Sequence, residues 1–527
     1  MNVTLATITL TTLDWSFIIG FFIIALAIGI YTSRQAGKSE ADFFLGGRTM
    51  PWWLLGFSMV ATTFSTDTPN LVTNLVRENG VSGNWCWWVF LLTGMLTVFV
   101  FSKVWRRSNL TTDVEFYEMR YSGKEAAFLR WFRSIYLGVF LNVMIMASVS
   151  LAAIKIGGIM LGLQPWECIV YAATVTVIFS SLGGFKGVLF TDFLLFIIAM
   201  VGAIAAAYYA LQHEAVGGLS GMMETFSANS EMKSKLSFFP KPGTSGFFTL
   251  FLIPLLIGWW SSWYPGAEPG GGGYLAQRML AAKNEKHAVG ATLFFNACHY
   301  AVRPWPWIIV ALCSLIVFPD IESIKAAFPE AENVANDSAY SAMLTFLPAG
   351  WMGLVLTSLV AAYMSTISTH LNWGSSYIVN DVYLRFLKPK ASQKELIWVA
   401  RISTVVLMVM AGIIALNMKS AQKNFELLLA IGAGTGSIYI LRWFWWRVNA
   451  YSEIAGMLIA TLNAFLFWQF DNFGLSGSMP LAVSVAITTI GWIVITLITR
   501  PTDKATLRKF VKQTNPGGPG WKKVYRE

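Results

Sequence analysis

Charged residues are scarce in this chain: Asp, Glu, Lys and Arg together make up 13% of its 527 residues. A soluble globular protein usually carries about 25% of such residues, so this composition argues against a water-exposed surface all round. Histidine and cysteine are also few, with four of each. They show no HExxH or paired CxxC spacing, which argues against the common zinc sites. No nucleophile–base motif is visible either, so we expect no enzymatic activity, no organic cofactor and no metal beyond an alkali cation.

Apolar residues are abundant instead, at 55% of the chain. Runs of roughly 20 apolar residues recur along its whole length, which is typical of an all-α polytopic membrane protein. The pattern predicts about thirteen spans. Their expected ranges are 13–33, 51–75, 83–105, 129–160, 166–182, 187–212, 247–280, 288–318, 345–384, 396–418, 424–446, 452–470 and 479–499.

Lys and Arg gather in alternate connections between these spans. The basic stretches are 34–48, 103–133, 278–286, 385–394, 442–447 and 500–526. Cytoplasmic loops of membrane proteins carry this excess, so we expect an outside N-terminus and a cytoplasmic C-terminus. The same rule accounts for the net charge of +10 without a nucleic-acid partner. The absence of a eukaryotic-style extended loop favours a bacterial inner membrane.

Spans two and seven share an unusual feature, which sets the expected domain organisation. Both are interrupted, and paired interrupted segments point to the binding site of a transporter. Because they are five spans apart, we expect two inverted five-helix repeats, at 51–212 and 247–446, within a single transmembrane domain of residues 1–500. The helix at 13–33 and two helices at 452–499 would flank this core. Residues 501–527 would form a basic cytoplasmic tail, solvated and attracted to anionic lipid.

The interruption of span two is rich in hydroxyl groups. Residues 62–69 read TTFSTDTP, with Asp67 beside Pro69. Proline removes a helix bond and disfavours helix in the residue before it. A single Ser or Thr in such a helix usually bonds its own i−4 carbonyl, but this density favours a polar site.

The interruption of span seven is the stretch GWWSSWYPGAEPGGGG at 258–273. Irregular backbone survives in a membrane only where protein covers it or a cavity adjoins it, and an intramembrane carboxylate is a functional candidate. We therefore expect Glu268 to face a solute. The alternative is that span seven ends near Tyr264 and Glu268 lies in an interfacial turn. The predicted solute residues are Asp67, Thr68, Trp85, Trp260, Trp263, Tyr264 and Glu268.

Span nine carries a polar stripe. Ala362, Ser365, Thr366 and Thr369 fall on one helix face, and Ser368 borders it. Neutral hydroxyls joined by freed backbone carbonyls can replace the water around a small hard cation; a small-residue packing seam is the alternative. Asp192, just inside span six, is open to an ion-binding role and to a capping or interfacial one.

Six motifs of the chain resemble the sodium/solute symporter family, which includes sugar, proline and sialic-acid carriers. They are FFLGGRTMPWWLLGFSMVATTFST (43–66), TTDVEFYEMRY (111–121), GGFKGVLFTD (183–192), YLAQRMLAAKNEKHA (274–288), SLVAAYMSTIST (358–369) and IVNDVY (378–383). The resemblance covers roughly residues 13–500. It implies a five-plus-five inverted-repeat core of the leucine-transporter type and sodium-coupled alternating access.

The resemblance also implies ligands for sodium. The principal site would use the carbonyls of Ala61, Phe64 and Ala362 and the hydroxyls of Ser365 and Thr366. A second site would use Asp192, Ser365, Ser368 and Thr369. The chain departs from sugar carriers at NWCWW (84–88) and in its PGAEPGGGG insertion, which weakens any transfer of solute identity.

Together these features predict a symporter that imports a small polar solute with sodium, with a sugar or sugar derivative favoured. A proton-coupled or uncoupled carrier on the same scaffold is the alternative, with Asp67, Asp192 or Glu268 cycling protons. A solute sensor is another, and a channel is disfavoured because no repeated filter residues occur. The expected partners are the solute, sodium ions and the lipid bilayer.

Overall fold

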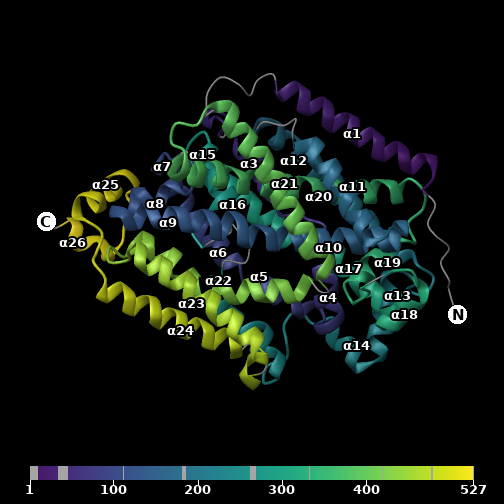
Figure 1. The fold of residues 1–527 in the computed structure, drawn as a ribbon. Helices are drawn as coiled ribbons and strands as arrows, with labels where there is room; N and C mark the ends of the chain where they lie inside the picture. Colours follow the sequence, from purple (N-terminus) through teal and green to yellow (C-terminus); the bar gives the residue numbers. More distant parts are fainter. Residues whose placement is uncertain are drawn as a thin grey trace.

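The computed structural model describes residues 10–33, 45–110, 112–180, 185–261, 269–331, 333–418, 421–475, 477 and 479–525. Within these ranges every regular element is a helix (Figure 1). The one strand-like pairing that they contain is an isolated bridge between Met50 and Ala282. The predicted all-helical architecture is therefore confirmed.

The first half of the chain folds into one peripheral helix and five membrane-length segments, two of which contain π-helical turns (η3 and η4). Its elements are α1 (Thr12–Ser33), α3 (Trp52–Thr62), α4 (Asp67–Asn79), η2 (Val81–Asn84), α5 (Trp85–Trp88), α6 (Leu91–Leu96), η3 (Thr97–Phe101), α7 (Ser102–Ser108), α8 (Glu115–Arg120), α9 (Gly123–Ile135), η4 (Tyr136–Leu141), α10 (Asn142–Leu161), α11 (Pro165–Ser180) and α12 (Phe185–Gln212).

The second half repeats this plan and adds further helices. Its elements are α13 (Gly218–Ala228), α14 (Ser230–Lys235), η5 (Phe247–Leu252), η6 (Pro254–Gly258), α15 (Gly273–Ala281), α16 (Glu285–Asn296), η7 (Ala297–Val302), α17 (Pro304–Val317), α18 (Ile321–Ala327), α19 (Ser338–Leu344), α20 (Trp351–Ser376), η8 (Tyr377–Leu387), α21 (Gln393–Asn417), α22 (Ala421–Phe444), α23 (Ala450–Gln469), α24 (Met479–Ile498), α25 (Lys504–Thr514), η10 (Pro519–Trp521) and α26 (Lys522–Tyr525).

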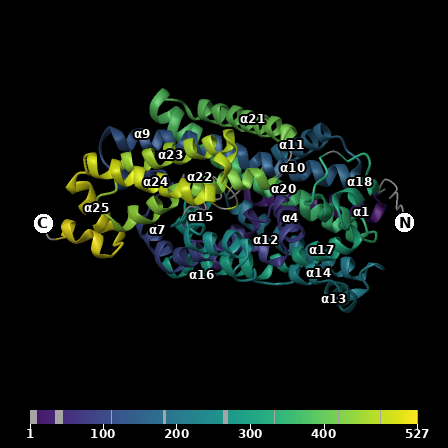
Figure 2. The same cartoon turned by 90° about the horizontal axis from the view of Figure 1, so that it is seen from below.

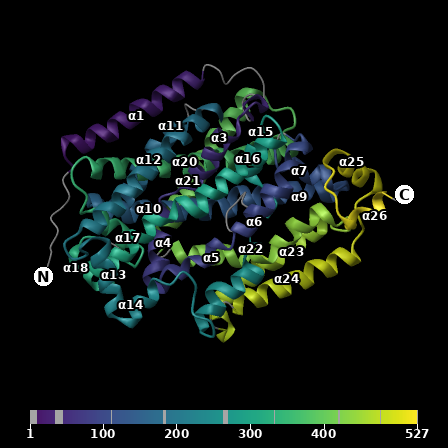
Figure 3. The ribbon, with the colours of Figure 1, turned by 180° about the vertical axis from the view of Figure 1, so that it is seen from behind.

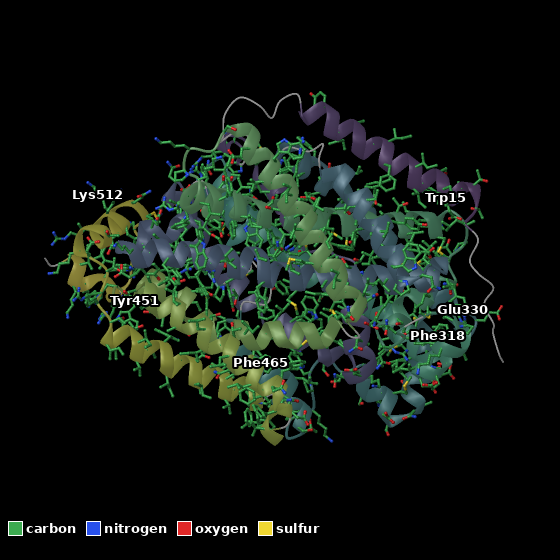
Figure 4. The ribbon with its side chains drawn as sticks, viewed as in Figure 1. Trp15, Phe318, Glu330, Tyr451, Phe465 and Lys512 are labelled. Atoms are coloured by element: carbon green, nitrogen blue, oxygen red, sulfur yellow. The ribbon has the colours of Figure 1, made fainter. Side chains whose placement is uncertain are left out.

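Eight helices of the described ranges are long and apolar enough to cross a membrane, judged by length and composition. Helices occupy the positions of the predicted spans, although the number of crossings itself stays a prediction. Large apolar side chains face outward on the outer helices: Trp468 is 71% exposed and Ile490 63%. Figure 4 shows Trp15 on α1 and Phe465 on α23 at opposite edges of the bundle. Such a surface suits lipid rather than water.

The broken helix α3 lies inside the bundle, where it packs against α12, α16 and α20 (Figure 3). Helices α23 and α24 pack against each other and against α22 along one edge, while α1 packs against α20 and α12 along the opposite edge (Figures 1 and 2). The flanking helices therefore enclose the segments that carry the polar residues.

The first break lies where the sequence places it. Helix α3 ends at Thr62 and α4 starts at Asp67. Pro69 falls in the first turn of α4, where its missing N–H has no intrahelical acceptor to lose. The four residues between the helices run through the protein interior, and Ser65 and Thr66 are both buried.

Of the two long loops, one between α12 and η5 and one between α17 and α20, the second is folded onto the bundle. Helix α19 packs against α4, α10 and α17. Lys155 of α10, only 2% exposed, donates to both carboxylate oxygens of Asp337 at 2.6 and 2.7 Å. Arg77 at the end of α4 donates to Asn336 at 3.1 Å. Ion pairing and hydrogen bonding thus hold the second loop against the helix that follows the first break.

The basic C-terminal segment differs from its prediction. Leu507, Phe510 and Trp521 are at most 1% exposed, so residues 504–525 pack onto the protein rather than extend into solvent. The apolar residues recur on one face of α25, and this amphipathic pattern drives the packing. Lys512 points outward from α25 (Figure 4), so the basic residues still form the outer surface of this segment.

Candidate functional site

The hydroxyl stripe of α20 faces the break between α3 and α4. Thr366 Oγ1 donates to the carbonyl of Thr62 at 3.2 Å. The carbonyl of Ala61 accepts from the N–H of Phe64 at 3.0 Å. Ala61, Phe64, Ala362, Ser365 and Thr366 are all buried. The structure thus brings the two elements of the predicted principal sodium site into contact.

Asp192 of α12 lies in the same region. Its carboxylate accepts from Ser58 Oγ at 2.6 Å and from Ser365 Oγ at 2.7 Å. The side chain is 1% exposed, so a capping or interfacial role does not describe it. Asp192 joins α12 to α3 and α20, and Ser365 is common to both predicted ion sites.

Arg278 of α15 provides the positive charge nearest to Asp192 in this group. The guanidinium lies 3.9 Å from the carboxylate and donates to Ser58 Oγ at 3.2 Å and to Thr62 Oγ1 at 3.4 Å. A buried carboxylate needs such compensation, because burying a lone charge is very costly. Sequence analysis counted Arg278 among the basic residues of a connection between spans, but its side chain is 1% exposed and belongs to this site; the signal was a basic residue in the apolar YLAQRML segment.

The other two residues of the predicted second site behave differently from each other. Ser368 Oγ donates to the carbonyl of Ser365 at 3.1 Å, the usual local bond of a helical serine. Thr369 Oγ1 is buried and has no hydrogen-bond partner among the described residues. Thr369 therefore has its whole hydroxyl available to a ligand, whereas Ser368 keeps its oxygen lone pairs.

Asp67 lies at the start of α4, half-buried, and accepts a hydrogen bond from Ser65 Oγ. The N–H of the neighbouring Thr68 donates to the carbonyl of Ser65 at 3.3 Å. The charge of Asp67 also interacts with Arg303. Asp67 therefore lies inside the break, but its oxygens serve the local turn as well.

Two basic residues that sequence analysis missed line the same break. Arg303 is 1% exposed, donates to Thr63 Oγ1 at 3.3 Å and lies 5.4 Å from the ring centre of Trp307. His299 Nδ1 lies 3.2 Å from the same hydroxyl. Both precede α17 in the stretch HYAVRPW, where no periodic pattern marks them.

The aromatic residues among the predicted solute contacts do not all lie around a common site. Trp85 donates from its indole to the carbonyl of Phe238 at 2.9 Å and stacks on Phe239 at 5.4 Å, so it packs under the loop between α12 and η5. Trp260 lies against Trp259, with ring centres 5.4 Å apart. Trp263, Tyr264 and Glu268 lie outside the described residues.

A cavity of about 40 Å³ lies between the third span, α15 and α16. A water centre needs about 10–15 Å³, so the cavity has room for a few waters. Of the predicted solute residues that the structure describes, Asp67, Thr68, Trp85 and Trp260, none lines it. Its described lining residues are Phe90, Thr93, Gly94, Thr97, Tyr274, Leu275, Thr292, Phe295, Asn296 and Tyr300.

Comparison with known proteins places this architecture in a family. The model of the sodium:solute symporter family matches residues 43–460. The sodium/myo-inositol cotransporter 2 of Oryctolagus cuniculus is 27% identical over 86% of this chain and 69% of its own length. The sodium/glucose cotransporter of Vibrio parahaemolyticus is 24% identical over 85% of this chain and 83% of its own.

Solved structures agree on the fold. A Na+-coupled sialic acid symporter in a substrate-bound, outward-open state matches with a TM-score of 0.73 and 18% identity, over 94% of this chain and 99% of that one. MHP1, a nucleobase-cation-symport-1 family transporter in a closed conformation, matches with a TM-score of 0.51 and 10% identity, over 93% and 99%.

The chain belongs to the sodium:solute symporter family. It is therefore a multi-pass membrane protein with a leucine-transporter-type fold, and it couples solute movement to sodium. These conclusions confirm the predicted recognition, fold class and general function.

Proposed function

We propose that this protein carries a neutral polyhydroxylated solute, a sugar or a cyclic polyol, into the cytoplasm together with sodium. The observation that carries the proposal is the meeting of Thr366 with the Thr62 carbonyl at the end of α3. There, neutral oxygens from two separate segments adjoin unwound backbone inside a membrane protein. Sodium and a few other small cations are the ligands that such a set of oxygens suits.

The hydrogen bonds at this junction leave the hydroxyl oxygens available to a cation. Ser365 gives its proton to Asp192, and Thr366 gives its proton to the Thr62 carbonyl. A hydroxyl that donates keeps two acceptor lone pairs. Sodium bound by these oxygens and by the carbonyls of Ala61, Phe64 and Ala362 would join α3 to α20.

Such a bridge is how the ion would drive transport by alternating access. An ion shifts a conformational equilibrium only by its difference in affinity between the states. Separation of α3 from α20 would remove part of the ligand set, so sodium would favour the state in which they are joined. The solute would then bind to a core that the ion has already ordered.

The solute class is supported by two observations. The named relatives are cotransporters of myo-inositol and glucose, and a sodium/mannose cotransporter of Bos taurus is 24% identical over 85% of this chain and 77% of its own length. The cavity beside the broken helices is lined by aromatic rings, hydroxyls and one amide. Such a lining suits a ring with an apolar face and a hydroxyl rim. Asp67, Thr68, Trp260, Trp263, Tyr264 and Glu268 stay proposed contacts of the solute, and the part of Trp85 is the least supported because its indole is already bonded.

A second sodium at Asp192, Ser365, Ser368 and Thr369 is part of the proposal. It would share Ser365 with the first ion and would meet the charge of Arg278 close by. Binding there therefore requires Arg278 to move or to tolerate the added charge.

The test is uptake of labelled myo-inositol, glucose and mannose into proteoliposomes under an inward sodium gradient, with potassium replacing sodium in the control. We expect accumulation in sodium alone, abolished by a sodium ionophore. Accumulation in potassium under a pH gradient would favour the proton-coupled alternative. Solute binding without uptake under any gradient would favour the sensor.

A further inference from the structure

The cavity beside the broken helices contains an acceptor without a donor. Asn296 of α16 is 1% exposed, and its Nδ2 donates to the Thr292 carbonyl at 2.7 Å. Its Oδ1 is buried without a hydrogen-bond partner in the described parts of the chain. Buried polar atoms are nearly always bonded, and each exception calls for an explanation.

Gly94 on the facing helix makes room for this amide. A Cβ at position 94 would lie 1.8 Å from Asn296 Oδ1, so any other residue would push the amide away. Two threonine hydroxyls of the cavity are already used: Thr97 Oγ1 donates to the Thr93 carbonyl and Thr292 Oγ1 to the Ala288 carbonyl, each at 3.0 Å. Asn296 Oδ1, in contrast, is held in place and can still accept a hydrogen bond.

We propose that Asn296 Oδ1 accepts a hydrogen bond from a hydroxyl of the transported solute, and that Gly94 is its positioning residue. The inference rests on the proposed function. None of the described lining residues is charged, so the cavity suits a neutral hydroxyl donor rather than a carboxylate or an ammonium group. The cavity is smaller than a hexose, so it receives one edge of the ring.

The test is a series of deoxy analogues of whichever of myo-inositol or glucose the wild-type protein takes up, measured on wild type and on Asn296→Leu. In wild type, loss of one hydroxyl raises KM by roughly 3- to 10-fold, the value of one neutral hydrogen bond. In Asn296→Leu the parent solute shows the same rise, and removal of that hydroxyl has no further effect. Gly94→Ala reproduces the pattern.

The matched control is Asn463→Leu, because Asn463 is a buried asparagine of α23 that bonds Thr488 at 3.3 Å, outside this cavity. It leaves the analogue profile unchanged. Unaltered sensitivity to every deoxy position in a folded Asn296→Leu protein overturns the inference while sodium-driven uptake stands. Absence of sodium-driven uptake of either parent solute by wild type instead overturns the proposed function.

A separate observation concerns residues 504–525, which we call the C-terminal clamp. Trp521 donates from its indole to the Trp443 carbonyl at 2.8 Å and packs on Phe510 at 5.5 Å. The Arg120 guanidinium lies 5.0 Å from the ring centre of Trp521. A Cβ at Gly520 would lie 1.8 Å from the carbonyl oxygen of Phe444, so the clamp touches the end of α22 backbone to backbone.

An aromatic column connects the clamp to the second broken span. Phe510 contacts Trp443 at 5.7 Å, and Trp443 contacts Trp105 at 5.3 Å. Trp105 in turn donates from its indole to the Gly270 carbonyl at 2.5 Å. Gly270 and Gly271 have φ of 94° and 78°, the left-handed region that favours glycine. This glycine turn leads directly into α15.

From this column we infer that the C-terminal clamp holds the start of α15 against α7 on the side predicted to be cytoplasmic. Helix α15 carries Arg278 and two cavity residues, so its release would open the cavity and loosen the contact with Asp192. The basic outer face of the clamp is then a surface feature, and its buried aromatic face is what restrains α15.

The test is hydrogen–deuterium exchange of residues 270–281 in lipid nanodiscs. We expect Trp521→Ala and Gly520→Val to raise the exchange rate there about tenfold, since each removes or obstructs the docking. The matched control replaces the exposed Arg508, Lys509 and Lys512 by Gln, which weakens attraction to anionic lipid and leaves the buried face intact. Unchanged exchange in the docking variants overturns the inference, and so does faster exchange in the charge variant alone.

Discussion

The two broken spans of this transporter are held in place by different kinds of contact. The break after α3 is short and surrounded by hydroxyls, a carboxylate and two buried guanidinium groups, Arg278 and Arg303. The break before α15 continues into a glycine turn that leans on Trp105 and the aromatic column. Hydrogen bonds and charge interactions hold the first break in place, whereas close packing of backbone atoms holds the second. The oxygens of the first break therefore suit a cation that tolerates the nearby guanidinium groups, whereas the second break depends on small residues at its contacts.

We expect the largest effect from a substitution that removes the charge compensation at the first break. Arg278→Leu leaves the Asp192 carboxylate uncompensated, and loss of one partner of a buried pair typically costs about 3–5 kcal/mol. We expect a large fall in thermal stability in detergent and loss of sodium-driven uptake. The double variant Arg278→Leu with Asp192→Asn should recover most of the stability. If it does not, Arg278 acts through packing rather than through charge.

The second largest effect is expected on the binding of sodium. Ser365→Ala with Thr366→Ala removes two proposed oxygens, and we expect the half-saturating sodium concentration to rise at least about tenfold. Ser375→Ala is the control, since Ser375 lies further along α20 and bonds the Asn372 carbonyl at 3.1 Å. Unchanged sodium dependence in the double variant would remove the principal site from α20.

The third prediction concerns the second break, which is held by close backbone packing. A Cβ at Gly436 of α22 would lie 1.6 Å from the carbonyl oxygen of Trp260, so Gly436→Ala must push the second broken span away. Overpacking of this kind costs about 1–3 kcal/mol, and we expect a lower maximal uptake rate with little change in sodium dependence. Gly20→Ala is the control, because a Cβ there meets no atom within 4 Å. A shift in sodium affinity instead would show that the two breaks are coupled.

The smallest expected effect distinguishes the contributions of two hydroxyls, Ser368 and Thr369, to the predicted second ion site. Ser368→Ala should raise the half-saturating sodium concentration less than Thr369→Val does, because the Ser368 hydroxyl is already bonded within its own helix. Thr369→Val should lower the cooperativity of sodium activation if a second ion binds there. Equal responses of the two variants, measured as sodium activation curves at saturating solute, would contradict the distinction.

Local sequence signals predicted the fold and half of the site. Proline and crowded hydroxyls marked the first break, and the spacing of Ser365 and Thr366 marked the stripe that meets it. The position of Asp192 was found, but its interfacial alternative did not hold, because only the packing of α12 shows that its carboxylate is buried. The solute residues were less well placed: Trp85 turned out to lie under the loop between α12 and η5, since aromatic composition gives no direction to a side chain.

The sequence by itself determined the apolar spans, the two interruptions and the hydroxyl face of α20, because each depends on residues close together in the chain. Tertiary structure decided which charges compensate one another and which oxygens stay unpaired. Arg278 and Ser58 are 220 residues apart, and so far-separated a contact leaves no periodic trace. Tertiary structure also determined where the basic C-terminal segment lies. Its charge pattern predicted a solvated anchor, but burial of its aromatic face on α22 and α7 outweighed solvation.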